Sequence, residues 1–447
     1  MTTTVRRAGA FAAVGTLAFA VPVAAGLASP AVATVAATAP FLVVAFFAMF
    51  AIGPDTPMFD VFARPGDYQD GRLYGLAAFA LAAASLAFLA IQFGLPVWVF
   101  VSTVVIVAYG NFGQRVANRF HSDEVVATAG FVVTGFACGT AGALVAARIG
   151  SGSVAPATAL FLAGTGALVA ALFRSVLFER DDPLVVLSVG LLLWLLVELD
   201  PGAGTTRVFI ALGVSAVLGY VAYALDTASL PGMLTGVLLS LLTIVLGGYG
   251  WFAMLITFFG LGGLSTKYQY EAKQDRGIAE ENEGARGSGN VLANSIVALV
   301  AVVLWAASPT HITVDPTLFL YAFAGAVAAA MTDTFSSEFG GLYDNPRLIT
   351  TFERVEPGTD GGVTWQGIVA GLVGAAIIAG IGAATLDGVG PLGAALIVGC
   401  GFVGMTVDSV LGATVEGTVV GNQGVNTLAT LAAALTGVAA ALATSLV

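Results

Sequence analysis

Long apolar stretches recur along the whole chain, and short polar segments separate them. An apolar run of about 18 or more residues is long enough to cross the hydrocarbon core of a bilayer as a helix. The pattern predicts about fifteen such helices. Their expected positions are 8–29, 31–53, 73–92, 94–110, 125–147, 154–173, 183–199, 208–226, 230–247, 249–265, 291–307, 317–332, 365–385, 389–407 and 427–446. We therefore expect an all-α, polytopic integral membrane protein.

Composition supports this prediction and excludes several classes of protein. Hydrophobic residues make up 58% of the chain and charged residues 10%, and the mean hydropathy is +0.94. The surface of an ordinary soluble enzyme carries far more charge. The net charge of −11 argues against a nucleic-acid partner. The two histidines, His121 and His311, lie in short loops far from the polar stretches at 266–294, 332–362 and 408–426, so neither a histidine-ligated metal nor a Ser-His-Asp triad is expected.

The distribution of basic residues predicts an orientation. Cytoplasmic loops of membrane proteins are enriched in Lys and Arg. If the N-terminus is cytoplasmic and the spans alternate, every basic residue except Arg148 and Arg207 falls on the cytoplasmic side. We therefore expect a multi-pass protein of the cell membrane whose N-terminus lies in the cytoplasm.

Three polar stretches interrupt the second half of the chain, at 266–294, 332–362 and 408–426. The alternation of spans places all three on the cytoplasmic face. A cluster of ionisable residues beside a membrane suggests substrate, ion or headgroup chemistry, although plain linkers would have the same location. We expect one composite active site in a catalytic transmembrane domain at 206–447, and a transmembrane scaffold of unknown role at 1–205.

The first polar stretch offers groups that could hold phosphate. Its middle alternates acidic and basic residues, which is also typical of a solvated amphipathic helix. Its end, GARGSGN at 284–290, places Arg286 among glycines, so backbone amides and the guanidinium could approach an anion. Asn290 and Asn294 share one helical face, where they could coordinate a ligand or only cap the helix. Lys267, near the start of the stretch, is a further candidate for phosphate binding.

The second stretch begins with a pattern suited to a hard metal ion. In TDTFSSE at 332–338, Asp333 and Ser337 are four residues apart and share a helical face, and Glu338 follows. Oxygen ligands at the edge of a membrane favour Mg²⁺, which prefers such ligands and retains water. We expect Asp333 and Glu338 in a magnesium site, with Ser337 in the catalytic centre.

The same stretch continues into a glycine-rich turn flanked by charges. Thr359 and Asp360 precede Gly361 and Gly362, whose bare backbone could approach a phosphate, and Arg354 could pair with it. The string is neither a GxxxxGK[ST] loop nor a dinucleotide fingerprint. Its acidic and basic flanks nevertheless favour a binding turn.

The third stretch places Asp408 at the cytoplasmic end of one span and Asn426 at the start of the last. Asp408 is a candidate magnesium ligand, and Asn426 is a candidate for nucleotide binding. By itself, the string DSVLGAT at 408–414 is equally typical of helix packing through small residues.

These strings resemble those of a known family. The segments TDTFSSEFG at 332–340, PRLITTFERVEPGTDGGVTWQG at 346–367 and DSVLGATVEG at 408–417 are similar to the integral-membrane family that contains phytyl-phosphate kinase and transmembrane protein 19. RGSGNVLAN at 286–294 fits the same pattern. The resemblance covers roughly residues 210–447 and extends more distantly to dolichol kinases and CDP-diacylglycerol synthases.

The resemblance implies a chemistry and assigns residues to it. Plant members transfer a phosphate from a nucleoside triphosphate to an isoprenoid monophosphate, and the distant relatives use CTP. The matching residues here are Asp333, Ser337, Glu338, Arg354, Thr359, Asp360, Gly361, Gly362, Asp408 and Asn426. We therefore expect a lipid phosphotransferase that makes a prenyl diphosphate with Mg²⁺ and CTP or ATP, with the prenyl tail between helices.

Two other functions fit the same chain. A CTP-dependent cytidylyltransferase acting on a lipid phosphate could use the same site, because only the phosphorus atom that is attacked differs. A transporter or lipid translocase would suit many glycine-rich spans. However, transporters place substrate groups near the bilayer midplane, and the predicted spans hold almost no charge.

Overall fold

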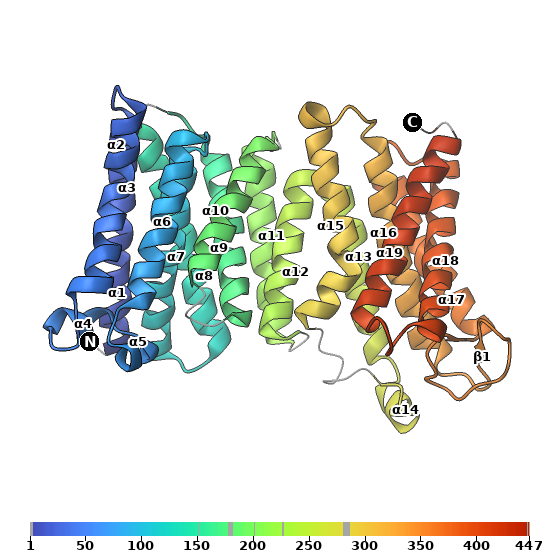
Figure 1. Ribbon diagram of the computed structural model, residues 1–447. Coiled ribbons are helices and arrows are strands. Elements are labelled where there is room, and N and C mark those ends of the chain that lie inside the picture. The colour runs from blue at the N-terminus through green and yellow to red at the C-terminus, as the bar shows by residue number, and fades with distance from the viewer. Residues whose placement is uncertain are drawn as a thin grey trace. The chain divides into compact units, whose positions relative to one another are not determined.

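The computed structural model describes residues 3–150, 152–177, 182–200, 202–225, 228–279, 287–444 and 446. Within these ranges, 14 helices are long and apolar enough to cross a membrane (Figure 1). The prediction of an all-α, polytopic membrane protein is confirmed. The remaining predicted span, 183–199, corresponds to helix α10 (Asp182–Glu198), whose 17 residues fall just short of the 18 that define a span.

The chain folds into two compact units, Met1–Leu212 and Gly213–Val447, here called the N-terminal and C-terminal units. The boundary lies within helix α11 (Thr205–Ala224). Besides α10, the N-terminal unit contains α1 (Thr3–Gly15), η1 (Thr16–Phe19), α2 (Ala20–Ala25), α3 (Pro30–Phe46), η2 (Phe47–Ala51), α4 (Pro57–Phe62), α5 (Pro65–Asp70), α6 (Tyr74–Gln92), α7 (Val97–Phe120), α8 (Glu124–Ile149) and α9 (Pro156–Val176).

A buried group of charges joins distant segments of the N-terminal unit. Asp182, at the start of α10, pairs with Arg174 of α9 and with Arg64, whose Nη2 lies 2.6 Å from Asp182 Oδ2. Arg174 also donates to Asn111 Oδ1 at 3.1 Å. The cavity among these side chains measures about 10 Å³, roughly the room one water needs. We call Arg64, Arg174 and Asp182 the arginine cluster.

The C-terminal unit is arranged around α16 (Thr317–Gly340), the most buried of the spans. Its other elements are α12 (Leu230–Leu242), η4 (Thr243–Gly247), α13 (Tyr249–Lys267), α14 (Tyr270–Asp275), α15 (Ser288–His311), β1 (Arg347–Leu348), β2 (Gly362–Val363), α17 (Trp365–Thr385), α18 (Pro391–Thr414) and α19 (Asn422–Ala443). The two short strands pair antiparallel at the base of the loop between α16 and α17.

Glycines on α17, α18 and α19 bring three helices against α16. A Cβ on Gly371 of α17 would lie 2.8 Å from the backbone oxygen of Thr332, and one on Gly401 of α18 would lie 2.6 Å from Thr332 Oγ1. On α19, a Cβ at Gly437 would lie 2.6 Å from the backbone oxygen of Tyr321. Small residues permit such close helix packing in membranes. The three neighbours therefore fix the position of α16 and of the polar residues at its end.

Candidate functional site

A polar cavity of about 370 Å³ lies at the end of the C-terminal unit that also carries α14 and the β1 loop (Figure 1). Its walls come from the starts of α15 and α19, the ends of α16 and α18, and the loop between α16 and α17. Predicted residues that line it are Asn290, Asn294, Asp333, Ser337, Glu338, Thr359, Asp360, Gly361, Gly362, Asp408 and Asn426. The volume is typical of a small-molecule site. The structure thus brings residues from all three polar stretches together.

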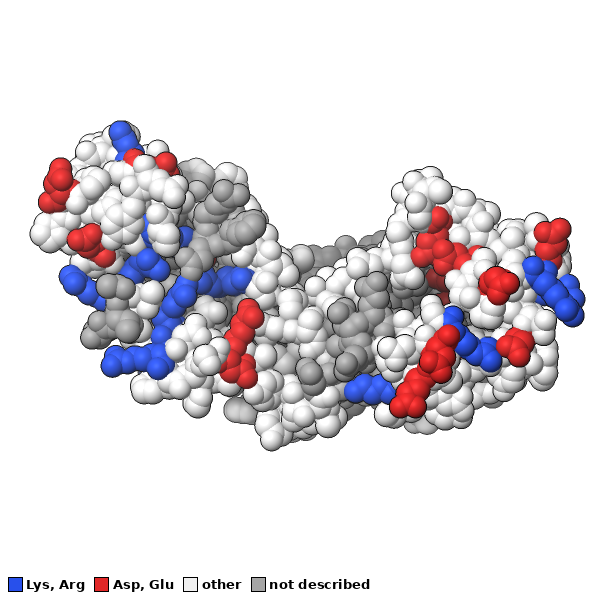
Figure 2. Space-filling model, turned by 90° about the horizontal axis from the view of Figure 1, so that it is seen from below, with Lys and Arg blue, Asp and Glu red and all other residues white. Residues whose placement is uncertain are grey.

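The cavity is strongly acidic. Asp333 of α16 and Asp408 of α18 lie close enough to share a hydrogen bond, and Glu416 and Asp360 add negative charge nearby. Asp408 Oδ2 is buried without a hydrogen-bond partner in the described part of the chain. The described residues that line the cavity include no Lys or Arg. Acidic side chains also gather on this face of the C-terminal unit, on the right of Figure 2.

These carboxylates fit a magnesium ion better than a metal held wholly by protein. Buried negative charges need a counter-charge. Asp408 Oδ2, which accepts no hydrogen bond from the described residues, could bind a cation. Across the described ranges, no group of three or more His, Cys, Asp or Glu side chains is arranged to hold a metal ion by itself. Mg²⁺ does not require such a group, because one or two carboxylates usually hold it and water and substrate phosphates complete its shell.

Glu416 was not expected in the site. It follows α18 and lines the cavity together with Asn422 of α19. Burial raises the pKa of the Glu416 carboxyl, the nearby charge of Asp360 raises it further, and a hydrogen bond with Asn422 opposes both effects. The residue belongs to the string DSVLGATVEG, but it lies beyond the helix end, so helical spacing could not connect it with Asp408.

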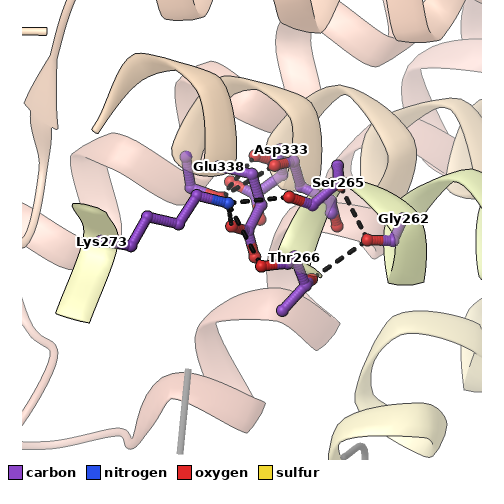
Figure 3. A network of polar contacts seen from close by, with 8 residues as sticks. Gly262, Ser265, Thr266, Lys273, Asp333 and Glu338 are labelled. Carbon is purple, nitrogen blue, oxygen red and sulfur yellow. Dashed lines mark hydrogen bonds and ion pairs between the residues drawn. The ribbon is translucent and has the colours of Figure 1, made fainter. Parts of the chain in front are cut away.

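Glu338, which we expected to help hold a metal ion, forms an ion pair with a lysine. Lys273 of α14 lies with its Nζ 2.5 Å from Glu338 Oε2. The ammonium also donates to the backbone oxygens of Ser265 at 2.7 Å and Thr266 at 3.3 Å (Figure 3). Lys273 is only 2% exposed, so the interpretation of this segment as a solvated helix is wrong at this residue. The buried pair fastens α14 to α16.

The predicted cationic phosphate clamp is not assembled in the described structure. Lys267 lines a separate apolar groove. Arg354 lies with Asp344 and Glu356 in another surface depression. Arg286 lies outside the described residues. The sequence placed these cations near the polar stretches but could not place their side chains in the cavity.

Glycine lets the loop between α16 and α17 reach the cavity. Gly361 has φ +74°, and a Cβ there would lie 2.6 Å from the backbone oxygen of Ser409 on α18. A side chain at this position would therefore push the loop away. The amide of Gly362 donates to the backbone oxygen of Thr359 at 2.9 Å. That amide is already used by the turn, so the structure does not leave it pointing freely at a phosphate.

Three of the hydrogen bonds made by amide and hydroxyl groups in the cavity wall join residues four apart in one helix. Asn294 Nδ2 donates to the backbone oxygen of Asn290 at 3.0 Å, and Asn426 Nδ2 donates to Asn422 Oδ1 at 3.1 Å. Ser337 Oγ donates to the backbone oxygen of Asp333 at 3.0 Å, within its own helix. These contacts orient the side chains in the wall and leave further hydrogen-bonding capacity on the amides.

Known proteins resemble the part of the chain that holds this cavity. An uncharacterized membrane protein, MJ0933 of Methanocaldococcus jannaschii, is 31% identical over 253 residues, which are 54% of this chain and 97% of the relative. Protein PGR of Arabidopsis thaliana is 30% identical over 47% of this chain and 79% of its own length. Protein VTE6, chloroplastic, from the same plant is 29% identical over 42% of this chain and 56% of its own length.

No solved structure matches the chain. A family model described as Integral membrane protein DUF92 matches residues 213–441. This match includes every described residue that lines the cavity. The chain therefore belongs to the integral membrane protein family DUF92.

Proposed function

We propose that the cavity is the active site of a lipid phosphotransferase that converts a prenyl monophosphate into a prenyl diphosphate with a nucleoside triphosphate. The observation that carries the proposal is the group of carboxylates formed by Asp333, Asp408, Asp360 and Glu416, which line a cavity without Lys or Arg among its described residues. Such a site suits phosphates only when they arrive with a cation. Phosphoryl transfer depends mainly on positioning and charge neutralisation.

The residues of the cavity have distinct parts in this proposal. Asp333 and Asp408 would hold Mg²⁺, which when bound would neutralise charge on the phosphates. Asn290, Asn294 and Asn426 would hydrogen-bond the nucleotide, and the loop at Thr359 would cover it. An acceptor phosphate oxygen attacks the γ-phosphorus, the bond to the β,γ-bridging oxygen breaks, and the nucleoside diphosphate leaves. The acceptor is already ionised, so no dedicated base is needed.

The location of the site is also part of the proposal. The bias of basic residues supports a cytoplasmic N-terminus. Nine of the spans precede the start of α15, so the cavity lies on the cytoplasmic face of the cell membrane in this proposal only if α10 also crosses the bilayer. Nucleoside triphosphates are supplied on that side.

The decisive assay uses purified full-length protein, Mg²⁺, geranylgeranyl or phytyl monophosphate, and CTP or ATP labelled at either the α- or the γ-phosphorus. We expect γ label in a prenyl diphosphate, and loss of the product when Mg²⁺ is chelated. Product that carries the α label would instead support cytidylyl transfer. No transfer to any isoprenoid phosphate would refute the proposal.

A further inference from the structure

The C-terminal unit contains a second cavity of different character. It is a groove of about 460 Å³ formed by the end of α11, by α12 and by α13, with Val291 of α15 at one side. Apolar side chains such as Met233, Ile256 and Phe259 line it. Among the described lining residues, Lys267 is the one that carries charge, and it is the last residue of α13. The groove is therefore apolar along its length and cationic at one end.

Glycines give this groove its depth. A Cβ on Gly236 of α12, or on Gly260 or Gly263 of α13, would have no heavy atom within 4 Å. The glycines that face α16 behave in the opposite way, because a Cβ on Gly371 would meet a backbone oxygen at 2.8 Å. Glycine usually serves close helix approach in membranes. Here it leaves open space that no neighbouring helix fills.

The groove and the acidic cavity lie on two sides of the same helix start. Val291 lines the groove, whereas Asn290 and Asn294 line the cavity. Successive residues of a helix point about 100° apart, so the first turns of α15 separate the two spaces. The cationic end of the groove also lies at the cavity end of the unit, because the chain runs from Lys267 directly into α14, where Lys273 reaches Glu338.

We propose that this groove holds the isoprenoid chain of the lipid phosphate and that Lys267 receives its phosphate group. The inference rests on the proposed function, whose acceptor must keep an apolar chain in the membrane and present a phosphate to the acidic cavity. From Ile256 to Lys267 the groove extends for about 16 Å at the usual helical rise. An apolar groove with a single cation at its end matches a lipid that has one apolar chain and one anionic headgroup.

Binding is tested without catalysis, using full-length protein in phosphatidylcholine nanodiscs and geranylgeranyl monophosphate that carries a diazirine at the chain end. We expect photolabel on peptides of α12 and α13. Gly260→Phe should reduce labelling at least about tenfold by filling the groove. Gly399→Phe is the matched control, because Gly399 of α18 is exposed and a Cβ there also has no neighbour within 4 Å. Label on other helices, or equal loss in the control, would overturn the inference.

The role of Lys267 is tested by competition. Unlabelled geranylgeranyl monophosphate should compete about tenfold better than geranylgeraniol, and Lys267→Gln should abolish that preference while Lys267→Arg retains it. Equal competition by phosphatidic acid, a diacyl lipid with a terminal phosphate, would show that the groove takes lipid phosphates in general and would overturn the assignment to an isoprenoid chain.

A short acceptor separates this inference from the proposed function. Isopentenyl monophosphate is too short to need the groove, so Gly260→Phe should preserve phosphate transfer to it while raising the KM for geranylgeranyl monophosphate about tenfold. Equal effects on both acceptors would overturn the groove assignment. Wild-type protein that labels in the groove but transfers phosphate to neither acceptor would refute the proposed function alone.

Discussion

The arginine cluster and the acidic cavity are both polar groups at the ends of apolar helices, but they differ in charge balance and in space. Asp182 lies between Arg64 and Arg174, and the cavity among them is about 10 Å³. Asp333 and Asp408 face each other in a cavity of about 370 Å³, without Lys or Arg among its described lining residues. In the first group one carboxylate joins two guanidinium groups with almost no space between them, whereas in the second group like charges surround an open cavity.

This difference distinguishes a structural ion cluster from a binding site more clearly than burial does. Both groups contain buried carboxylates, so burial alone does not separate them. Figure 2 shows the same contrast on the surface, where basic side chains predominate on the N-terminal unit and acidic ones on the C-terminal unit. Removal of charge from each group tests this contrast.

The largest effect is expected for Asp182→Ala. The change leaves two buried guanidinium groups without their carboxylate, which should cost about 3–5 kcal/mol in the free energy of unfolding. Denaturant unfolding in detergent measures this loss, and Asp55→Ala, at an exposed position, is the control. A cost below about 1 kcal/mol would show that the arginine cluster does not hold the N-terminal unit together.

Unlike Asp182→Ala, Asp333→Asn and Asp408→Asn should not lower the free energy of unfolding. Both changes should strongly lower activity. Each change keeps the size and removes repulsion, so the metal-free protein should unfold no more readily than the wild type. Loss of a charged magnesium ligand should lower turnover about a hundredfold, equivalent to about 3 kcal/mol. Asp315→Asn, in the exposed loop before α16, is the control. Near-native turnover in a folded Asp333→Asn protein would remove the metal assignment.

Lys273 and Glu338 form an oppositely charged pair beside the two like-charged carboxylates, so they sharpen the comparison. Lys273→Met should leave the Glu338 carboxylate buried and unpaired, at a cost of about 2–3 kcal/mol, and should expose the α14 segment to protease. The double variant Lys273→Met/Glu338→Gln should recover most of the loss. Limited proteolysis between α13 and α15 measures it. If the double variant were cleaved by protease as readily as Lys273→Met alone, the loss would not be due to the unpaired charge of Glu338.

The smallest effect concerns the pH dependence of Glu416. Its pKa is raised by burial and by Asp360, so the folded protein binds a proton more tightly there than the unfolded chain does. The stabilisation is complete below the unfolded pKa and is lost as pH rises through the folded pKa. Glu416→Gln should reduce the dependence of the free energy of unfolding on pH in this range. Added Mg²⁺ should do the same in the wild-type protein. A variant with an unchanged profile would contradict the prediction.

Hydropathy predicted the spans because the two requirements for crossing a bilayer, length and apolar composition, are properties of each segment by itself. It also placed Asp333 and Asp408 near helix ends, and the structure brings them together from α16 and α18. The burial of Lys273 could not be predicted, since alternating charges describe a solvated helix equally well until a partner such as Glu338 is known. Glu416 was missed for a related reason, because its approach to Asp360 depends on a turn rather than on a helical period.

The glycine contacts around α16 have a kinetic consequence. Three helices meet its backbone directly, so it has little freedom to slide or rotate relative to them. Asp333 is therefore a stationary point in the membrane. The movements of a catalytic cycle at this cavity are therefore those of the lipid, the nucleotide and the loop between α16 and α17. Helix α16, which carries the carboxylate, stays in place.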